Sequence, residues 1–239
     1  MKKGVVVLGS LILALAFCVP AVAQPSAKAV ETIVIDNFDT PDNMEWKWDI
    51  QASRFIAKGY PVLKTVEGIP NSLRPFHKDS DPAAQVLGAK VSYDRKGDNW
   101  FEIYQKDANG ERFEYEFVGT ITQIDFWVWG ANYNYNLEVL VRDCDGVVRV
   151  LNAGSLRFQG WKNVIINVPG WIRQHSRFRN GRPNLTFVGF RVRSAASEAV
   201  DNFAIYFDQL KYTTNTLSNI YDGYDLRAVD FGENTNSAN

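Results

Sequence analysis

The chain has 239 residues, with 26 lysines and arginines against 27 aspartates and glutamates, and 13% of its residues are aromatic. A formal net charge of −1 argues against a polycation built for nucleic acid, which would need a clear surplus of basic side chains. The length allows one large sandwich or two small domains, and the many aromatic side chains favour strands and large cores or interfaces.

The start of the chain has the three parts of an export signal. Lys2 and Lys3 give a charged start, an almost unbroken apolar run covers residues 5–19, and small residues precede a cleavage position before Gln24. The apolar run is too short for a comfortable membrane span. We therefore predict a signal peptide over residues 1–23 and an exported mature protein without a membrane span.

Cleavage would leave a single cysteine in the mature chain. Cys18 lies in the apolar run, where its acylation would make a lipoprotein, although Phe17 fits poorly before such a cysteine. Cys144 would remain, so no internal disulfide is possible. We expect a partly buried thiol, with an intermolecular bridge as the alternative. Residues 24–30 are predicted to form a short flexible leader.

Segments with the period-two pattern of strands recur after the leader, bounded by Gly, Asn, Asp and Pro. The expected strands are 32–38, 86–93, 100–105, 120–129, 136–142, 147–151, 162–168, 185–193 and 202–212, with one or two more within 44–66. A short helix is expected over 171–178. Many short strands with long loops predict an all-β antiparallel sandwich of jelly-roll type, with few short helices. We expect one domain over 31–212 and a polar C-terminal tail over 213–239.

Alternation along the 120–129 strand assigns its two faces. Ile124, Phe126 and Val128 should face the core, so Trp127 and Trp129 fall on the opposite face. The inward sets expected for two later strands are Leu137, Val139 and Val141, and Val188, Phe190 and Val192. Asp145-Gly146 is predicted to be a two-residue hairpin turn.

An aromatic cluster begins with these two tryptophans. Tyr133 and Tyr135 follow Trp127 and Trp129 closely in the sequence. Outward tryptophans usually form a sugar platform or a protein interface, unless a second layer covers them. We interpret the four aromatic side chains as candidate contacts for a partner or a glycan.

Charge is unevenly distributed near the C-terminus. The stretch from Trp171 to Arg193 has six arginines and no acid: Arg173, Arg177, Arg179, Arg182, Arg191 and Arg193. The tail has the acids Asp222, Asp225, Asp230 and Glu233 against one arginine. Arginine favours interfaces because its planar fork binds carboxylates. Either these are solvated loops, or the basic stretch of one subunit contacts the acidic tail of the next.

Few residues suit catalysis. The two histidines, His77 and His175, lack ligand spacing and are predicted to be solvated or structural. Among Glu111, Glu114 and Glu116, the last two would share one face of a strand, roughly 7 Å apart, which allows a glycosidase hypothesis. The same alternation is typical of an exposed strand, so we predict that the protein is not an enzyme.

Three aspartates are candidates for a metal site. Asp36, Asp39 and Asp208 come from the first and last expected strands, and carboxylate oxygens suit calcium. The simpler interpretation is that they are turn carboxylates and caps. We predict no cofactor and leave a structural calcium as an alternative.

Five segments in order resemble a known family. They are Glu31–Asp39 (ETIVIDNFD), Gln123–Gly130 (QIDFWVWG), Asn132–Tyr135 (NYNY), Val188–Arg191 (VGFR) and Ile205–Lys211 (IYFDQLK). The sequence is similar to the spirochaete flagellar filament outer-layer, or FlaA sheath, family over most of the mature chain. The end of the last strand also resembles carbohydrate-binding modules of the jelly-roll type.

The family resemblance implies a function, a location and partners. It implies a periplasmic sheath protein that coats the flagellin core filament and contributes to filament shape, stiffness and motility, without catalytic residues. Its expected partners are the core, other sheath proteins and further copies of itself, with glycans on the core as a further option. The alternative function is a secreted carbohydrate-binding module with an exposed tryptophan platform.

Overall fold

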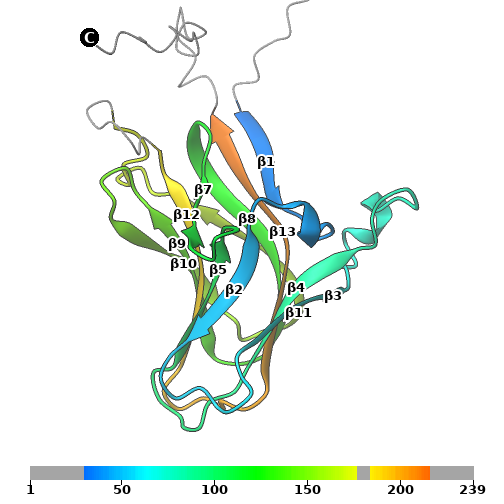
Figure 1. The fold of residues 1–239 in the computed structure, drawn as a ribbon, viewed down its shortest axis with the longest axis vertical. Helices are drawn as coiled ribbons and strands as arrows, with labels where there is room; N and C mark the ends of the chain where they lie inside the picture. Colours follow the sequence, from blue (N-terminus) through cyan, green and yellow to red (C-terminus); the bar gives the residue numbers. More distant parts are fainter. Residues whose placement is uncertain (1–29, 177–183, 216–239) are drawn as a thin grey trace, which may run out of the picture.

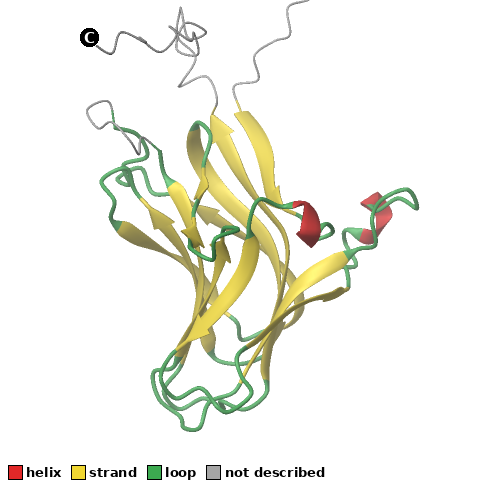
Figure 2. Ribbon diagram, in the orientation of Figure 1, coloured by secondary structure: helices red, strands yellow, loops and turns green. Residues whose placement is uncertain are grey.

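A computed structural model describes residues 30–176 and 184–215 of the chain. Two antiparallel sheets pack face to face as a β-sandwich (Figure 1), which confirms the predicted fold class. Apart from strands, the described residues contain two short 3-10 helices, η1 (Pro41–Asn43) and η2 (Arg74–Phe76) (Figure 2). Neither the first described range nor the second holds a helix long and apolar enough to cross a membrane.

The six-stranded sheet has the order β11-β8-β13-β4-β3, and β1 pairs with β13. Its strands are β1 (Val30–Asp36), β3 (Val62–Glu67), β4 (Gln85–Val91), β8 (Thr120–Ala131), β11 (Gln159–Asn167) and β13 (Phe203–Asn215). Val30 lies opposite Asn215 in the register of β1 and β13. The two ends of the described domain therefore lie side by side, as Figure 1 shows.

The seven-stranded sheet has the order β10-β9-β12-β5-β2, with two short strands at its side. Its strands are β2 (Lys47–Ala52), β5 (Trp100–Lys106), β6 (Arg112–Phe113), β7 (Tyr115–Glu116), β9 (Tyr135–Arg142), β10 (Val148–Ser155) and β12 (Thr186–Ser194). β6 pairs with β5, and β7 pairs with β12. All nine predicted strands are present, and the 44–66 region supplies β2 and β3.

The core lies between the two sheets and is rich in phenylalanine. Phe190 of one sheet stacks on Phe207 of the other, with ring centroids 4.4 Å apart, and Phe126 meets Phe190 edge to face at 5.0 Å. All three side chains are fully buried. Such aromatic pairs add to the stabilisation from buried area.

Three local predictions are wrong, and backbone geometry gives the reason for two of them. A bulge in β12 between Phe187 and Gly189 shifts the alternation, so Val188 is buried outside the core cluster, whereas Phe187 belongs to it. The predicted two-residue turn is a longer loop between β9 and β10, in which Gly146 has φ +85°. Residues 171–176 form turns and a bridge instead of the start of a helix.

The last strand is also longer than expected. Residues 213–215, predicted to begin the polar tail, continue β13 and pair with both β1 and β8. The leader at 24–29, the signal and the rest of the tail lie outside the described residues, so the remaining domain division stays a prediction.

Candidate interaction surface

A row of aromatic side chains crosses the outer face of the six-stranded sheet. The register places Trp161 of β11, Trp129 of β8 and Tyr206 of β13 directly opposite one another. Directly paired residues point to the same face of a sheet, so these rings lie together. Trp129 and Tyr206 meet edge to face, with centroids 5.4 Å apart and planes at 78°. All three side chains are half-buried.

Gly88 extends this row into the next strand. It lies opposite Tyr206 in the pairing of β13 with β4. A Cβ atom at Gly88 would lie 2.7 Å from a ring carbon of Tyr206, so the tyrosine ring lies directly over the glycine backbone. The absence of a side chain at this position allows the ring to lie there.

Trp127 lies in the next row of the same face. Its cross-strand neighbours are Asn163 of β11 and Asp208 of β13, and it is half-buried. Ile165 of β11 points the same way and is 56% exposed. We refer to the outward side chains Trp127, Trp129, Trp161, Ile165 and Tyr206 as the aromatic face. The predicted outward direction of Trp127 and Trp129 agrees with this arrangement, although neighbouring residues cover the larger part of each side chain.

Polar contacts border the aromatic face. Lys211 of β13 and Asp125 of β8 form an ion pair at 3.6 Å. The Asn163 side-chain amide of β11 donates to the same Asp125 carboxylate at 2.8 Å. An apolar centre with a polar rim is the usual composition of a protein interface.

The two tyrosines after this strand do not belong to the surface. Tyr135 is 1% exposed and stacks on Phe203, with centroids 4.3 Å apart. Its hydroxyl donates to the carbonyl of Ala199, and that of half-buried Tyr133 donates to the carbonyl of Asp201. The predicted contact role is therefore wrong for Tyr135. It precedes Leu137 by two positions, so the period of β9 places it on the core face.

The sequence prediction omits Trp161 and Tyr206, although the same alternation would have found them. Val164 of β11 faces the core, so Trp161 three positions earlier faces outward. Ile205 and Phe207 both face the core, so Tyr206 between them faces outward. Pairing between strands distant in the sequence, which a single strand does not reveal, brings these residues next to Trp129.

The described arginines of the basic stretch are already paired within the chain. The pairs are Arg173 with Asp145 (2.8 Å), Arg191 with Glu138 (2.6 Å) and Arg193 with Asp98 (2.7 Å). The excess of positive charge seen in the sequence is therefore smaller in the fold. Arg177, Arg179 and Arg182, and the tail acids Asp222 and Asp225, lie outside the described residues.

The candidate catalytic carboxylates make structural contacts instead. Glu114 accepts from the Arg142 guanidinium through both oxygens, at 2.7 to 3.0 Å, and from the Thr186 hydroxyl at 2.7 Å. Glu116 accepts from the side-chain amide of Asn184. Glu114 lies between the two short strands β6 and β7.

The histidine and the cysteine of this region are also structural. His175 uses both ring nitrogens, one with Thr120 and the other with Asn184, each at 3.0 Å. His77 lines a separate pocket together with Asp39 and Asp208, but among the described residues it belongs to no group of three or more side chains that could hold a metal ion. Cys144 is 3% exposed, so the intermolecular bridge gains no support from the fold.

The three calcium candidates lie close enough to influence one another. Burial raises the pKa of Asp208 to about 7, and the nearby Asp39 and Asp36 add to this shift. The Asp36 oxygens accept from the Trp48 indole and the Phe38 backbone, both at 2.7 Å. Asp39 accepts from Asn37 and Gln85. Within 30–176 and 184–215 no group of three such side chains could hold a metal ion, so these residues do not fit a calcium site.

An all-β sandwich with an aromatic outer face is a candidate binding or structural module. The sequence profile of the FlaA family, flagellar filament outer layer protein, matches residues 28–221. The chain belongs to this family, which confirms the resemblance seen in the sequence.

Relatives in spirochaetes carry similar names. A putative flagellar filament outer layer-like protein of Brachyspira hyodysenteriae is 27% identical over 196 residues, which cover 81% of this chain and 83% of the relative. The flagellar filament outer layer protein of Treponema pallidum is 29% identical over 60% of this chain and 45% of its own length. That of Borreliella burgdorferi is 29% identical over 42% of this chain and 32% of its own length. This chain therefore matches less than half of the latter two proteins.

Solved structures with a similar fold include carbohydrate-binding modules. One comes from a study of promiscuous modules of the β-sandwich superfamily, with a TM-score of 0.47 and 12% identity over 75% of this chain and 61% of that one. Another is a family 11 module of a Clostridium thermocellum cellulase, with a TM-score of 0.41 and 12% identity over 77% of this chain and 95% of that one. This likeness concerns the fold alone.

Proposed function

We propose that this chain is a non-enzymatic sheath subunit that coats the flagellin core of a periplasmic flagellum and docks through its aromatic face. The observation that carries the proposal is the row formed by Trp161, Trp129 and Tyr206, which faces away from the core in a fixed register. Large aromatic side chains that a core does not use are the commonest energetic centres of protein interfaces.

The ring geometry of Trp129 and Tyr206 favours a protein partner over a flat sugar platform made by this pair. A platform for sugar stacking needs ring faces that lie open and nearly coplanar. The ring planes of Trp129 and Tyr206 are inclined at 78°, so these two rings do not form one flat platform. Such a surface matches the irregular side chains of a protein better than the flat face of a sugar.

The proposed contribution to filament shape, stiffness and motility follows from repetition. A sheath places many copies along one filament, and multivalency strengthens contacts that are weak individually. Other sheath proteins, further copies of this chain and glycans on the core are additional proposed partners.

Export to the periplasm is part of the same proposal. It is supported by the predicted signal peptide over residues 1–23 and by the relatives, which are named as outer-layer proteins of spirochaete flagellar filaments. Recovery of the protein with periplasmic flagella from which detergent has stripped the outer membrane would support this location. Its absence from such filaments would contradict it.

We also propose that the basic stretch contacts the acidic tail, within one chain in preference to the head-to-tail contact considered from the sequence. Thr120 lies opposite Asn215, the last described residue before the tail, and its hydroxyl hydrogen-bonds His175. His175 and Asn215, which come shortly before residues 177–182 and the tail in the sequence, are therefore near each other at one end of the described domain. Groups linked so closely have a high effective concentration for each other.

Binding to purified core filaments tests the docking surface. We expect the double variant Trp129→Ala, Tyr206→Ala to remain folded and to cosediment with core filaments at least tenfold more weakly than the wild type. The matched control is Trp100→Ala, because Trp100 is also half-buried but begins β5 in the other sheet. Equal binding by the double variant and the wild type would overturn the proposed surface.

A further inference from the structure

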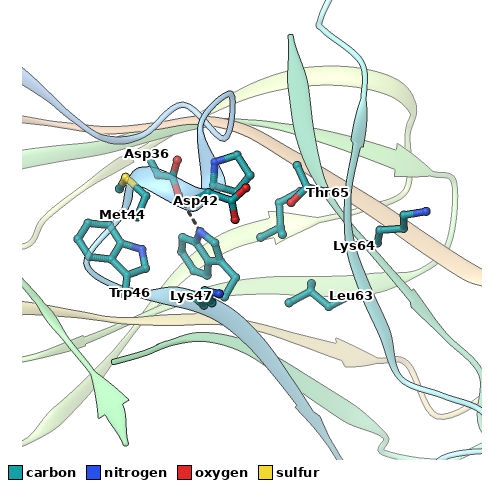
Figure 3. Close-up of a pocket in the computed structure, with 11 residues that line it drawn as sticks. Asp36, Asp42, Met44, Trp46, Lys47, Leu63, Lys64 and Thr65 are labelled. Carbon is teal, nitrogen blue, oxygen red and sulfur yellow. Dashed lines mark hydrogen bonds between the residues drawn. The ribbon is translucent and has the colours of Figure 1, made fainter. Parts of the chain in front are cut away.

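A pocket opens at the edge of the sandwich, and the residues that line it differ from those of the aromatic face. It has a volume of about 180 Å³ and lies where the first residues of the β2 region approach β3, with η1 beside it (Figure 3). Its walls include Asp36, Met44, Trp46, Trp48, Leu63 and Thr65. Apolar and hydrogen-bonding side chains therefore share one small space.

The indole of Trp46 has an unmet hydrogen bond in this pocket. Trp46 is 7% exposed, and its Nε1 is buried without a hydrogen-bond partner. The ring stacks on Phe113, with centroids 5.1 Å apart and planes at 13°, and meets Tyr115 edge to face. These contacts fix the ring, so it cannot turn its N–H to water. A buried donor without a partner is destabilising, because the hydrogen bond that it made to water in the unfolded chain is lost.

The neighbouring indole shows the contrast. Trp48 donates its Nε1–H to the Asp36 carboxylate at 2.7 Å, the bond drawn in Figure 3. Two tryptophans two positions apart therefore line one pocket, one with its donor satisfied and one without. An acceptor atom supplied by a ligand would complete the hydrogen bonding of Trp46.

The size of the pocket limits the ligand. Its volume is about six times the roughly 30 Å³ that a water molecule occupies in the liquid, and it is below the ≈ 300–1,000 Å³ typical of pockets for drug-sized molecules. One six-membered ring with its substituents, or one amino-acid side chain, is the matching scale.

The charges around the pocket select among such ligands. Lys47 and Lys64 line it together with the carboxylates Asp36 and Asp42. A cationic side chain would meet the two lysines, and an anionic one would meet the two carboxylates. A purely apolar side chain would leave the Trp46 donor unmet. A neutral ring that has both hydroxyl groups and an apolar C–H face avoids the two like-charge contacts and satisfies the Trp46 donor.

We propose that this pocket binds one neutral pyranose ring. Its hydroxyls would accept from the Trp46 Nε1–H and exchange hydrogen bonds with Thr65 and Asp42, while its C–H face lies against Leu63 and the indoles. The sugar is either a free monosaccharide or one residue of a glycan carried by a filament protein. The second case rests on the proposed sheath function, and the first does not.

The indole N–H resonances of the protein test the pocket directly. The chain has seven tryptophans, and the signal that disappears in Trp46→Phe belongs to Trp46. We expect D-glucose, D-galactose, D-mannose or N-acetylglucosamine to move this signal downfield in a saturable manner at millimolar concentrations. We expect Trp46→Phe, which keeps the aromatic stack, and Thr65→Val to weaken binding at least fivefold. Trp171→Phe should bind as the wild type does, because Trp171 is 66% exposed and lies outside the pocket.

Two outcomes would overturn the pocket assignment. One is that no sugar in this panel moves the Trp46 signal. This outcome includes the case in which a filament without glycans moves the Trp46 signal and the sugars do not. The other is that a sugar moves the Trp127 and Trp129 signals and leaves the Trp46 signal unchanged, which would support the exposed platform.

A second arm distinguishes the two sugar sources and separates this inference from the proposed docking. Core filaments are compared before and after chemical removal of glycans. A filament-borne glycan predicts that deglycosylation and Trp46→Phe weaken cosedimentation equally and not additively. A free-sugar site predicts no effect of either change on cosedimentation, while the sugar-induced shift persists. The docking double variant Trp129→Ala, Tyr206→Ala should retain that shift, so either proposal can fail alone.

Discussion

Trp129 and Tyr206 are direct cross-strand neighbours at the centre of the six-stranded sheet, and their rings meet edge to face on its outer surface. The Tyr206 ring also covers the backbone of Gly88 in the adjacent strand. The aromatic face thus lies on β11, β8 and β13 and rests on β4 through Gly88. Its shape depends on Gly88, which lies in β4 and not in the strand of Trp129 or of Tyr206.

This dependence predicts the effect of filling the space under the ring. Gly88→Ala should destabilise the protein by about 1–3 kcal/mol, the usual cost of overpacking, because the new methyl group would lie too close to the Tyr206 ring. The cost should largely vanish in a Tyr206→Ala background, in which the ring is absent. Urea unfolding of the four proteins of this double-mutant cycle measures the coupling. Equal costs in the two backgrounds would show that the ring does not rest on Gly88.

The contact between Glu114 and Arg142 predicts a structural role for Glu114, which the sequence analysis considered as a candidate catalytic carboxylate. Glu114→Gln loses the bidentate ion pair and should lower the free energy of unfolding by about 1–3 kcal/mol. Glu111→Gln is the matched control, because Glu111 is exposed, and it should change the stability by less than about 0.5 kcal/mol.

Enzymatic activity gives a second measurement on the same variants. The pure wild-type protein should release no reducing ends from glycosides, so neither variant should change this result. Turnover by the wild type that disappears in Glu114→Gln would support the glycosidase hypothesis and contradict the structural role.

The buried carboxylate of Asp208 predicts a dependence of stability on pH. Burial raises the pKa of Asp208 from 3.8 in the unfolded chain to about 7 in the fold. The folded state then binds more protons than the unfolded state between these values, so this contribution to stability is present at low pH and is lost as the pH rises towards 7. Its size is on the order of a few kcal/mol, at about 1.4 kcal/mol per pKa unit.

Asp208→Asn isolates this contribution. We expect the melting temperature of the variant to exceed that of the wild type near pH 7.5, and the difference to shrink or reverse near pH 4.5. Thermal unfolding of both proteins over this range provides the comparison, and Asp201→Asn, at an exposed position, is the control. A difference that does not change with pH would contradict the raised pKa.

The strand pattern alone identified most of the fold, because period-two alternation depends only on local sequence. It placed Ile124, Phe126 and Val128 in the core and turned Trp127 and Trp129 outward, as the structure shows. It did not predict the β12 bulge that displaces Val188 from the core cluster, since a bulge arises from pairing with neighbouring strands.

Features formed between distant segments were harder to predict. The aromatic face joins β8, β11 and β13, and the pocket joins the β1, β2 and β3 regions. The sequence around Trp46 did not indicate a binding site, because the missing partner of its Nε1–H becomes apparent only in the folded structure. The charge pattern was misleading in part: Arg191 and Arg193 lie beside acids that are 53 and 95 positions away in the sequence.

The proposed contact between the basic stretch and the tail predicts how a shortened chain will behave. Deletion of residues 216–239 removes the tail acids, among them Asp222 and Asp225. If the contact forms within one chain, the deletion should leave the concentration dependence of sedimentation unchanged.

Charge reversal in the full chain gives a second test. The double variant Asp222→Lys, Asp225→Lys should make the tail more accessible to limited proteolysis. A higher salt concentration should have the same effect on the wild type, because salt screens charges beyond about 8 Å at physiological ionic strength. Adding the reversals Arg177→Glu, Arg179→Glu and Arg182→Glu to the lysine variant should restore protection. Loss of self-association on deletion of the tail would contradict the contact within one chain and support the head-to-tail arrangement instead.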